Sequence, residues 1–156
     1  MLLITDVIIS APSELVHLEK DYLDLEWYEA GKTIIRRNSR MGREIAIKKQ
    51  TTPALEDGDL LFLAEDWCLL VNIIPCDCIV LKPVTMSEMA AVCFEIGNQH
   101  IPIFLTESDA ICIAYEAPLY SMLEKAGFCP VIEHRKLLKM HALKLNQKNE
   151  RQPFSL

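Results

Sequence analysis

The side chains in this sequence best suited to bind a transition metal at neutral pH are its histidines, His17, His100, His134 and His141. No two of them have the i, i+4 spacing that places a pair of ligands on one face of a helix. His134 and His141 are seven residues apart, about 10 Å along a helix, which is too far to share one ion. The sequence therefore contains no complete histidine metal site within one chain.

His100 is the strongest single candidate because a predicted helix ends just before it. Free carbonyls at a helix C-terminus carry partial negative charge that favours a cation, and neutral imidazole suits Ni, Zn and Cu. A lone histidine beyond a helix end is more often structural, so a metal role requires a second ligand. A two-fold axis near His100 would supply one from a second copy of the chain. We therefore expect His100 from both subunits to form the site, with His134 and His141 as candidate additional ligands.

Cys76 and Cys78 form a second candidate, a Cys-x-Cys pair in a predicted strand. Alternate strand residues share a face, so both thiols could contact one soft metal ion. A second pair at matching spacing is missing, and two core cysteines are the commoner explanation. Like these two, the other cysteines stand in apolar periodic segments, unlike the loop-rich frameworks of secreted disulfide proteins. We expect reduced thiols and a cytoplasmic protein.

Composition limits the classes of function. The chain has 156 residues and a net charge of −6, which disfavours nucleic acid as the main partner. Seven basic residues and one acidic residue lie between Lys32 and Lys49, and a solvated face of a sheet is the simpler interpretation of this segment. Asp6 interrupts the apolar start, which argues against a signal peptide, and no apolar stretch reaches the roughly 18 residues that span a membrane.

Catalytic motifs are missing from the sequence. It contains no G-x-x-x-x-G-K-[ST], G-x-G-x-x-G, G-x-S-x-G or H-E-x-x-H pattern. We therefore expect a protein that is not an enzyme. A thiol enzyme built on Cys76 and Cys78 is the weaker alternative.

The first 75 residues read as a β-rich N-terminal domain. Residues 33–37 and 44–48 flank a Gly-containing gap and predict a hairpin, while residues 60–64 and 68–74 predict further strands. This segment lacks a helical repeat. Its basic hairpin makes it a candidate docking domain for an acidic partner.

From Cys76 the pattern changes to alternating strands and helices. Thr85-Met86-Ser87-Glu88 is a capping box, and the apolar stripe that follows predicts a helix ending at Gly97-Asn98. A second helix is predicted from Pro118 to Ala126. The strands are predicted at residues 76–81, 101–105, 110–115 and 129–133. This β-α-β-β-α-β order over residues 76–133 is the ferredoxin-like arrangement, so the fold class is α+β.

The tail, residues 134–156, is polar and basic and looks like an appendage. We expect residues 147–156 to be disordered, and the segment from His134 to Leu145 has a weak helical pattern.

The segment Glu95-Ile96-Gly97-Asn98-Gln99-His100-Ile101-Pro102 resembles the hallmark of the urease accessory protein E family, in which G-N-[basic or polar]-H-x-P follows the first helix of the second domain. Further segments also resemble this family, namely Leu25-Glu26-Trp27, Arg36-Arg37, Gly42-Arg43-Glu44, residues 55–60 and residues 119–127. The resemblance covers residues 1–133. It implies a nickel metallochaperone whose second domain forms a homodimer, with His100 as the hallmark residue at the two-fold axis.

The same resemblance implies partners and metals. The partners are the urease accessory GTPase and the apo-urease assembly complex, and Zn(II) or Cu(II) should compete with Ni(II) because imidazole cannot exclude them by affinity. The chain departs from the family at Tyr115, Glu116 and Ala117, where some members carry histidines, and in a tail with only His134 and His141. We expect one ion per dimer. The alternative is an adaptor that binds protein or RNA through the basic hairpin and tail, with His100 structural.

Overall fold

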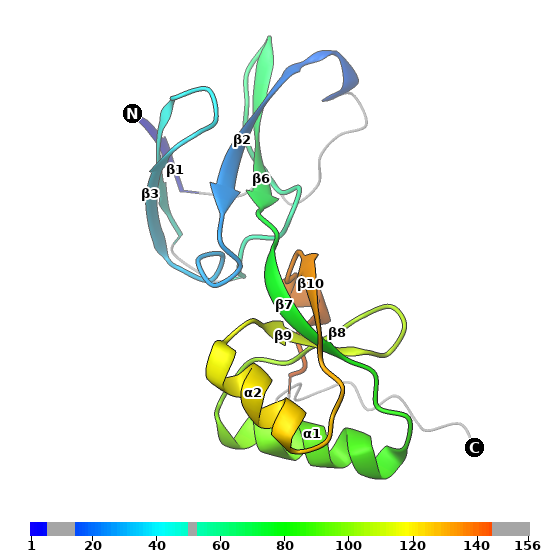
Figure 1. The fold of residues 1–156 in the computed structure, drawn as a ribbon. Coiled ribbons are helices and arrows are strands. Elements are labelled where there is room, and N and C mark those ends of the chain that lie inside the picture. Colours follow the sequence, from blue (N-terminus) through cyan, green and yellow to red (C-terminus); the bar gives the residue numbers. More distant parts are fainter. Residues whose placement is uncertain (6–14, 50–52, 145–156) are drawn as a thin grey trace, which may run out of the picture.

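The computed structural model describes residues 1–5, 15–49 and 53–144. These residues form an α+β fold with three β-sheets, and both α-helices belong to the C-terminal half, as predicted. Two sheets from the N-terminal half lie above the third sheet and its helices in Figure 1. No helix among the described residues is long and apolar enough to cross a membrane.

The described residues of the N-terminal half, up to Ile73, form two three-stranded sheets with one main buried cluster between them and a smaller one that contains Leu15, Leu60 and Cys68. The first sheet has the order β1 (Leu2–Ile4), β4 (Glu44–Lys48), β3 (Ile34–Asn38), and the second has the order β2 (Glu19–Leu25), β6 (Trp67–Ile73), β5 (Leu60–Leu63). A short 3-10 helix, η1 (Leu15–His17), precedes β2. The predicted hairpin is confirmed by the antiparallel pairing of β3 and β4, and Gly42 takes a positive φ of 79° in its turn.

The C-terminal half, residues 76–135, is a four-stranded antiparallel sheet with both helices on one face. Its elements are β7 (Cys76–Leu81), α1 (Met86–Asn98), β8 (Phe104–Leu105), β9 (Ile111–Ala114), α2 (Ala117–Lys125) and β10 (Val131–Arg135). The strand order β10-β7-β9-β8 confirms the predicted ferredoxin-like arrangement. β8 is shorter than the predicted strand from Ile101, because Pro102 has no N–H to donate to a sheet.

Helix α1 begins at the predicted capping box. The Thr85 hydroxyl accepts a 3.1 Å hydrogen bond from the Glu88 N–H, and the Glu88 carboxylate accepts one from the Thr85 N–H. Val92 and Ile96 are the helix residues that are fully buried against the sheet. Met86 and Ala90 belong to the apolar pattern that predicted the helix, but both are exposed.

The predicted helix from His134 to Leu145 is wrong over the residues that the structure describes. β10 continues to Arg135, because β7 starts at Cys76 and these two residues pair. Residues 136–144, here called the strap, then run along the protein with only a short 3-10 helix, η2 (Lys139–His141). Residues 147–156, predicted to be disordered, lie outside the described residues.

The strap contacts both halves of the molecule. Lys136 Nζ lies 2.9 Å from Asp57 Oδ1 and 2.9 Å from Asn72 Oδ1, both in the N-terminal half. Further along, Ala142 forms an antiparallel bridge with Phe104, at the β8 edge of the C-terminal sheet. The strap thereby holds the two halves together. The division into domains at residues 75 and 133 stays a prediction.

Candidate metal centre

His100 lies immediately beyond the C-terminus of α1. Gln99 caps the helix, and the His100 N–H donates a 3.0 Å hydrogen bond to the Gly97 carbonyl. His100 has a φ of 56°, in the left-handed region. Gly97 and Asn98 were predicted to take this conformation but are part of the helix. Histidine tolerates the left-handed region better than most residues, so the helix end fixes the backbone from which the imidazole projects.

The imidazole of His100 is available to a ligand. His100 is exposed, and within the described parts of the chain its ring makes no hydrogen bond or ion pair. The carbonyl end of the α1 dipole points toward this position and favours positive charge there. A single imidazole nevertheless supplies one coordinate bond, so an ion held here requires ligands from elsewhere.

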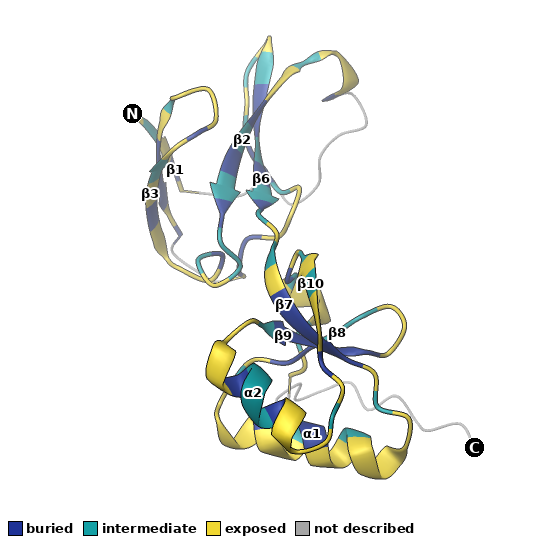
Figure 2. Ribbon diagram, in the orientation of Figure 1, coloured by how far each residue is buried: buried dark blue, intermediate teal, exposed yellow. Residues whose placement is uncertain are grey.

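An exposed apolar stripe runs along α1 toward His100. It consists of Met86, Ala90, Phe94 and Gly97, whose spacing of four, four and three residues aligns them on one side of the helix. Met86 is 85% exposed and Phe94 is 66% exposed. Figure 2 shows this outward side of α1 as exposed along the helix. Large apolar side chains gathered on one exposed face are typical of a protein contact.

His134, one of the two candidate additional ligands, lies on β10. Its Nδ1 is 3.0 Å from Asp77 Oδ1 on the neighbouring strand β7. β10 is one edge of the four-stranded sheet and β8, which follows His100 in sequence, is the other edge. Three strand spacings of about 4.8 Å separate these edges by about 14 Å. The structure therefore does not bring His134 beside His100 of the same chain.

His141, the other candidate, lies in η2 of the strap and is exposed. The strap runs antiparallel to the segment that leads out of His100: Ala142 bridges Phe104, and the Leu143 N–H donates a 2.7 Å hydrogen bond to the Ile103 carbonyl. His141 thus lies on the same sheet edge as the His100 segment. No group of three or more metal-ligating side chains converges among the described residues.

The Cys-x-Cys pair is close in space, as alternation on a strand predicts. Cys76 Sγ and Cys78 Sγ are 3.8 Å apart. A third cysteine that the sequence did not single out, Cys112 of β9, lies in the same buried cluster as Cys78, on the same face of the sheet. Burial raises the pKa of Cys76 to about 12, which opposes the thiolate that a thiol enzyme needs. The register of β7 against β9 would have identified Cys112, but the sequence does not determine that register.

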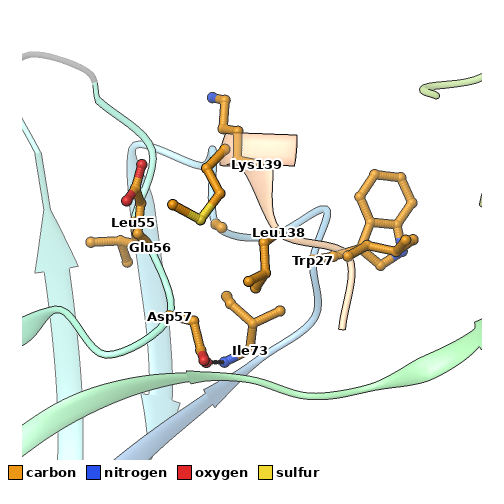
Figure 3. Close-up of a pocket in the computed structure, with 10 residues that line it drawn as sticks. Trp27, Leu55, Glu56, Asp57, Ile73, Leu138 and Lys139 are labelled. Carbon is orange, nitrogen blue, oxygen red and sulfur yellow. Dashed lines mark hydrogen bonds between the residues drawn. The ribbon is translucent and has the colours of Figure 1, made fainter. Parts of the chain in front are cut away.

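A small hollow lies where the strap crosses the N-terminal half. Figure 3 shows Trp27, Leu138 and Ile73 around it, with Asp57 accepting a 2.7 Å hydrogen bond from the Ile73 N–H. Its volume is about 90 Å³, below the roughly 300 Å³ of the smallest ordinary ligand clefts. It is therefore a packing gap between strap and sheet rather than a substrate cleft.

The basic residues of the β3–β4 hairpin are largely neutralised by carboxylates. Three ion pairs hold them, Arg37–Glu29 at 2.8 Å, Arg40–Asp24 at 2.7 Å and Arg43–Asp21 at 2.8 Å. Lys49 is buried and donates hydrogen bonds to the carbonyls of Ala30 and Pro53. Most of the charge that suggested a nucleic-acid surface is thus used within the fold.

Comparison with known proteins gives consistent matches. The family described as UreE urease accessory protein, N-terminal domain, matches residues 8–73. The urease accessory protein UreE of Acetivibrio thermocellus is 42% identical over 124 residues, covering 80% of this chain and 80% of that protein. The protein of the same name from Actinobacillus pleuropneumoniae is 35% identical, covering 83% and 69%, and that from Helicobacter pylori is 38% identical, covering 69% and 65%. The similarity extends over most of this chain.

Proposed function

Because the chain belongs to the UreE family of urease accessory proteins, we propose that it acts in urease maturation as a metallochaperone that binds Ni(II) and passes it on. Nickel is the cargo of this protein and not a resident cofactor. The protein's own chemistry is coordination and release, with no bond made or broken in a substrate. Its place is the cytoplasm, where its six cysteines stay reduced.

The observation that carries the proposal is the exposed imidazole of His100 at the end of α1, which has no hydrogen-bond partner among the described residues. Imidazole nitrogen is a good ligand for Ni(II), and the helix C-terminus favours the positive charge of the ion. The residue occupies an accessible position, so a partner protein can approach it. Accessibility matters because a chaperone must give up its metal.

The second ligand comes from a second copy of the chain. The stripe of Met86, Ala90, Phe94 and Gly97 is an apolar surface on the element that ends at His100, and two copies packed there would exclude it from water. A two-fold contact places a residue opposite its own copy only at the axis, so the proposal places the axis of the dimer at His100. The two His100 side chains then hold one Ni(II) per dimer, with water or a tail residue completing the shell.

His141 is the better placed auxiliary ligand. It belongs to the strap that runs back along the segment between His100 and β8, whereas His134 lies on β10, at the opposite edge of the sheet. Zn(II) and Cu(II) compete for the same imidazoles because affinity alone does not exclude them. The acceptors of the nickel are the urease accessory GTPase and the apo-urease complex that it serves.

Calorimetric titration with Ni(II) tests the proposal on three forms of the protein. The wild type should bind one Ni(II) per dimer, and His100→Ala should weaken binding by more than about 100-fold, because a direct ligand is lost. His17→Ala is the matched control, since His17 is also exposed but lies in η1 of the N-terminal half. Undiminished nickel binding by His100→Ala, with the protein folded, would refute the assignment.

A further inference from the structure

Three cysteines lie on the face of the C-terminal sheet that the helices leave uncovered. On β7 the residues Ile79 and Leu81 point into the helix-covered core, and the alternate residues Cys78 and Val80 point to the opposite face. Cys112 on β9 stands opposite Val80 on that same face. Cys76 packs against this second cluster as well. None of these thiols has a role in the nickel site proposed above.

The spacing of the first two thiols is that of two ligands on one ion. Two sulfur atoms that each lie about 2.3 Å from a shared metal are roughly 3.8 Å apart at a tetrahedral angle and about 4.6 Å apart in a linear arrangement. Cys76 Sγ and Cys78 Sγ are 3.8 Å apart, at the lower end of this range. A small increase in the distance between the two sulfur atoms covers the rest of this range. Metal binding therefore requires no change in the backbone of β7.

We propose that Cys76 and Cys78 form a second metal site, specific for Cu(I), that is independent of His100. Thiolates are soft ligands and favour Cu(I) among the first-row metals. A structural Zn(II) site requires four ligands, and no cluster of three or more ligands exists in the described part of the chain. Two thiolates are enough to coordinate Cu(I), and β7 supplies two.

Cys112 and the strap complete the environment of the pair. The Cys78 thiol lies 3.3 Å from the Cys76 carbonyl and 3.8 Å from the Arg135 carbonyl, and these contacts hold its sulfur in place. Cys112 borders a hollow of about 280 Å³ that Leu137 and His141 of the strap also line. Cys76 is only half-buried and Cys78 is fully buried. The ion reaches the pair at Cys76, while the surrounding apolar residues exclude water from the Cys78 side.

Binding must displace the thiol protons. A thiol that coordinates a metal is deprotonated by it, so a strongly thiophilic ion can bind where the free thiolate is disfavoured.

The test is an anaerobic titration of the full chain with Cu(I) in competition with a chromophoric Cu(I) chelator. We expect one Cu(I) per chain, and a loss of affinity of more than about 100-fold in both Cys76→Ser and Cys78→Ala, above the cost of losing an outer-sphere partner. The matched control is Cys93→Ser, because Cys93 also lies next to a sulfur, Met89 Sδ at 3.9 Å. His100→Ala should still bind Cu(I). Failure of the Cu(I) proposal can therefore be distinguished from failure of the nickel proposal.

A second measurement needs no variant and therefore does not depend on whether a substituted protein folds. One equivalent of Cu(I) should protect Cys76 of the wild type from alkylation, as read by mass spectrometry, while exposed Cys129 is modified at an unchanged rate. Wild-type Cu(I) affinity in folded Cys76→Ser, or protection that appears at Cys93 instead of Cys76, would overturn the proposal.

Discussion

Arg43 Nη1 donates a 2.8 Å hydrogen bond to Oδ2 of Asp21, and the Asp21 side chain is completely buried. The other carboxylate oxygen of Asp21 accepts the N–H of Met41 at the hairpin turn. The Arg43 guanidinium also lies 4.0 Å from the centre of the Trp67 ring on β6. This ion pair therefore joins the β3–β4 hairpin to the second N-terminal sheet, and a charge that looked free in sequence is a structural one.

Loss of the Asp21 charge should destabilise the N-terminal half. Breaking a fully buried ion pair costs about 3–5 kcal/mol, and because Arg43 is partly exposed we expect Asp21→Asn to lower the free energy of unfolding by about 2–3 kcal/mol. Urea denaturation measures this. Glu44→Gln, at an exposed position of β4, is the control and should change stability by less than about 0.5 kcal/mol. Equal effects from the two substitutions would show that the Arg43 pair contributes nothing.

Acid should weaken the same region through Asp24. A hydrogen bond from Arg40 lowers the pKa of Asp24 below that of an unfolded aspartate, which is about 3.9. The stabilisation is therefore fully present above about pH 4 and disappears as the pH falls through the folded pKa. Both side chains are partly exposed, so solvent screening keeps the contribution of this pair to stability small. Arg40→Gln should flatten the fall of stability below pH 4 in urea titrations; an unchanged slope would contradict the assignment.

RNA should bind weakly at best. Arg37, Arg40 and Arg43 are paired with carboxylates, which leaves Arg36 and Lys48 as the exposed strand residues without an ion pair in the described part of the hairpin. We expect a dissociation constant for single-stranded RNA above about 100 µM at physiological salt, the weak limit of non-specific binding. Fluorescence anisotropy at two salt concentrations measures it. Sub-micromolar, strongly salt-dependent binding would favour an adaptor role instead.

A substitution at the start of α1 should change the stability of the protein without changing its affinity for nickel. Thr85→Ala removes the hydroxyl that caps Glu88 N–H and should lower the free energy of unfolding by about 1 kcal/mol. Ser87→Ala is the control. Ser87 lies two residues after Thr85 and is exposed, so this substitution should leave the free energy of unfolding nearly unchanged. Thermal denaturation with parallel Ni(II) titration tests both. A large loss of nickel affinity in folded Thr85→Ala would contradict the placement of the site at the other end of the helix.

Features written in short stretches of sequence were predictable. The capping box at Thr85 and Glu88 located the start of α1, and the end of this helix before His100 also agreed with the structure. The order of strands and helices from Cys76 onward followed from hydrophobic periodicity, and the order predicted the sheet. These signals are local, because each depends on residues within a few positions of one another.

Features that depend on distant residues were not predictable. The register of β7 against β9 brings Cys112 to Cys78, and no pattern within either strand encodes it. The path of the strap depends on Lys136 reaching Asp57 and Asn72, far away in sequence. The pairing of the hairpin arginines likewise requires carboxylates from β2 and the loop after it. The residue that takes the left-handed conformation is His100, because α1 continues past Gly97, where this conformation was expected.

We propose above that two copies of His100 share one nickel ion at a two-fold axis. Anomalous scattering at the nickel edge from a nickel-soaked crystal tests it most directly, because it locates the ion without a mutation. We expect one nickel peak per pair of chains, bonded to the imidazoles of His100 from both subunits. A peak bound to one chain alone, or a principal peak at His134, at His17 or at the cysteines, would contradict it.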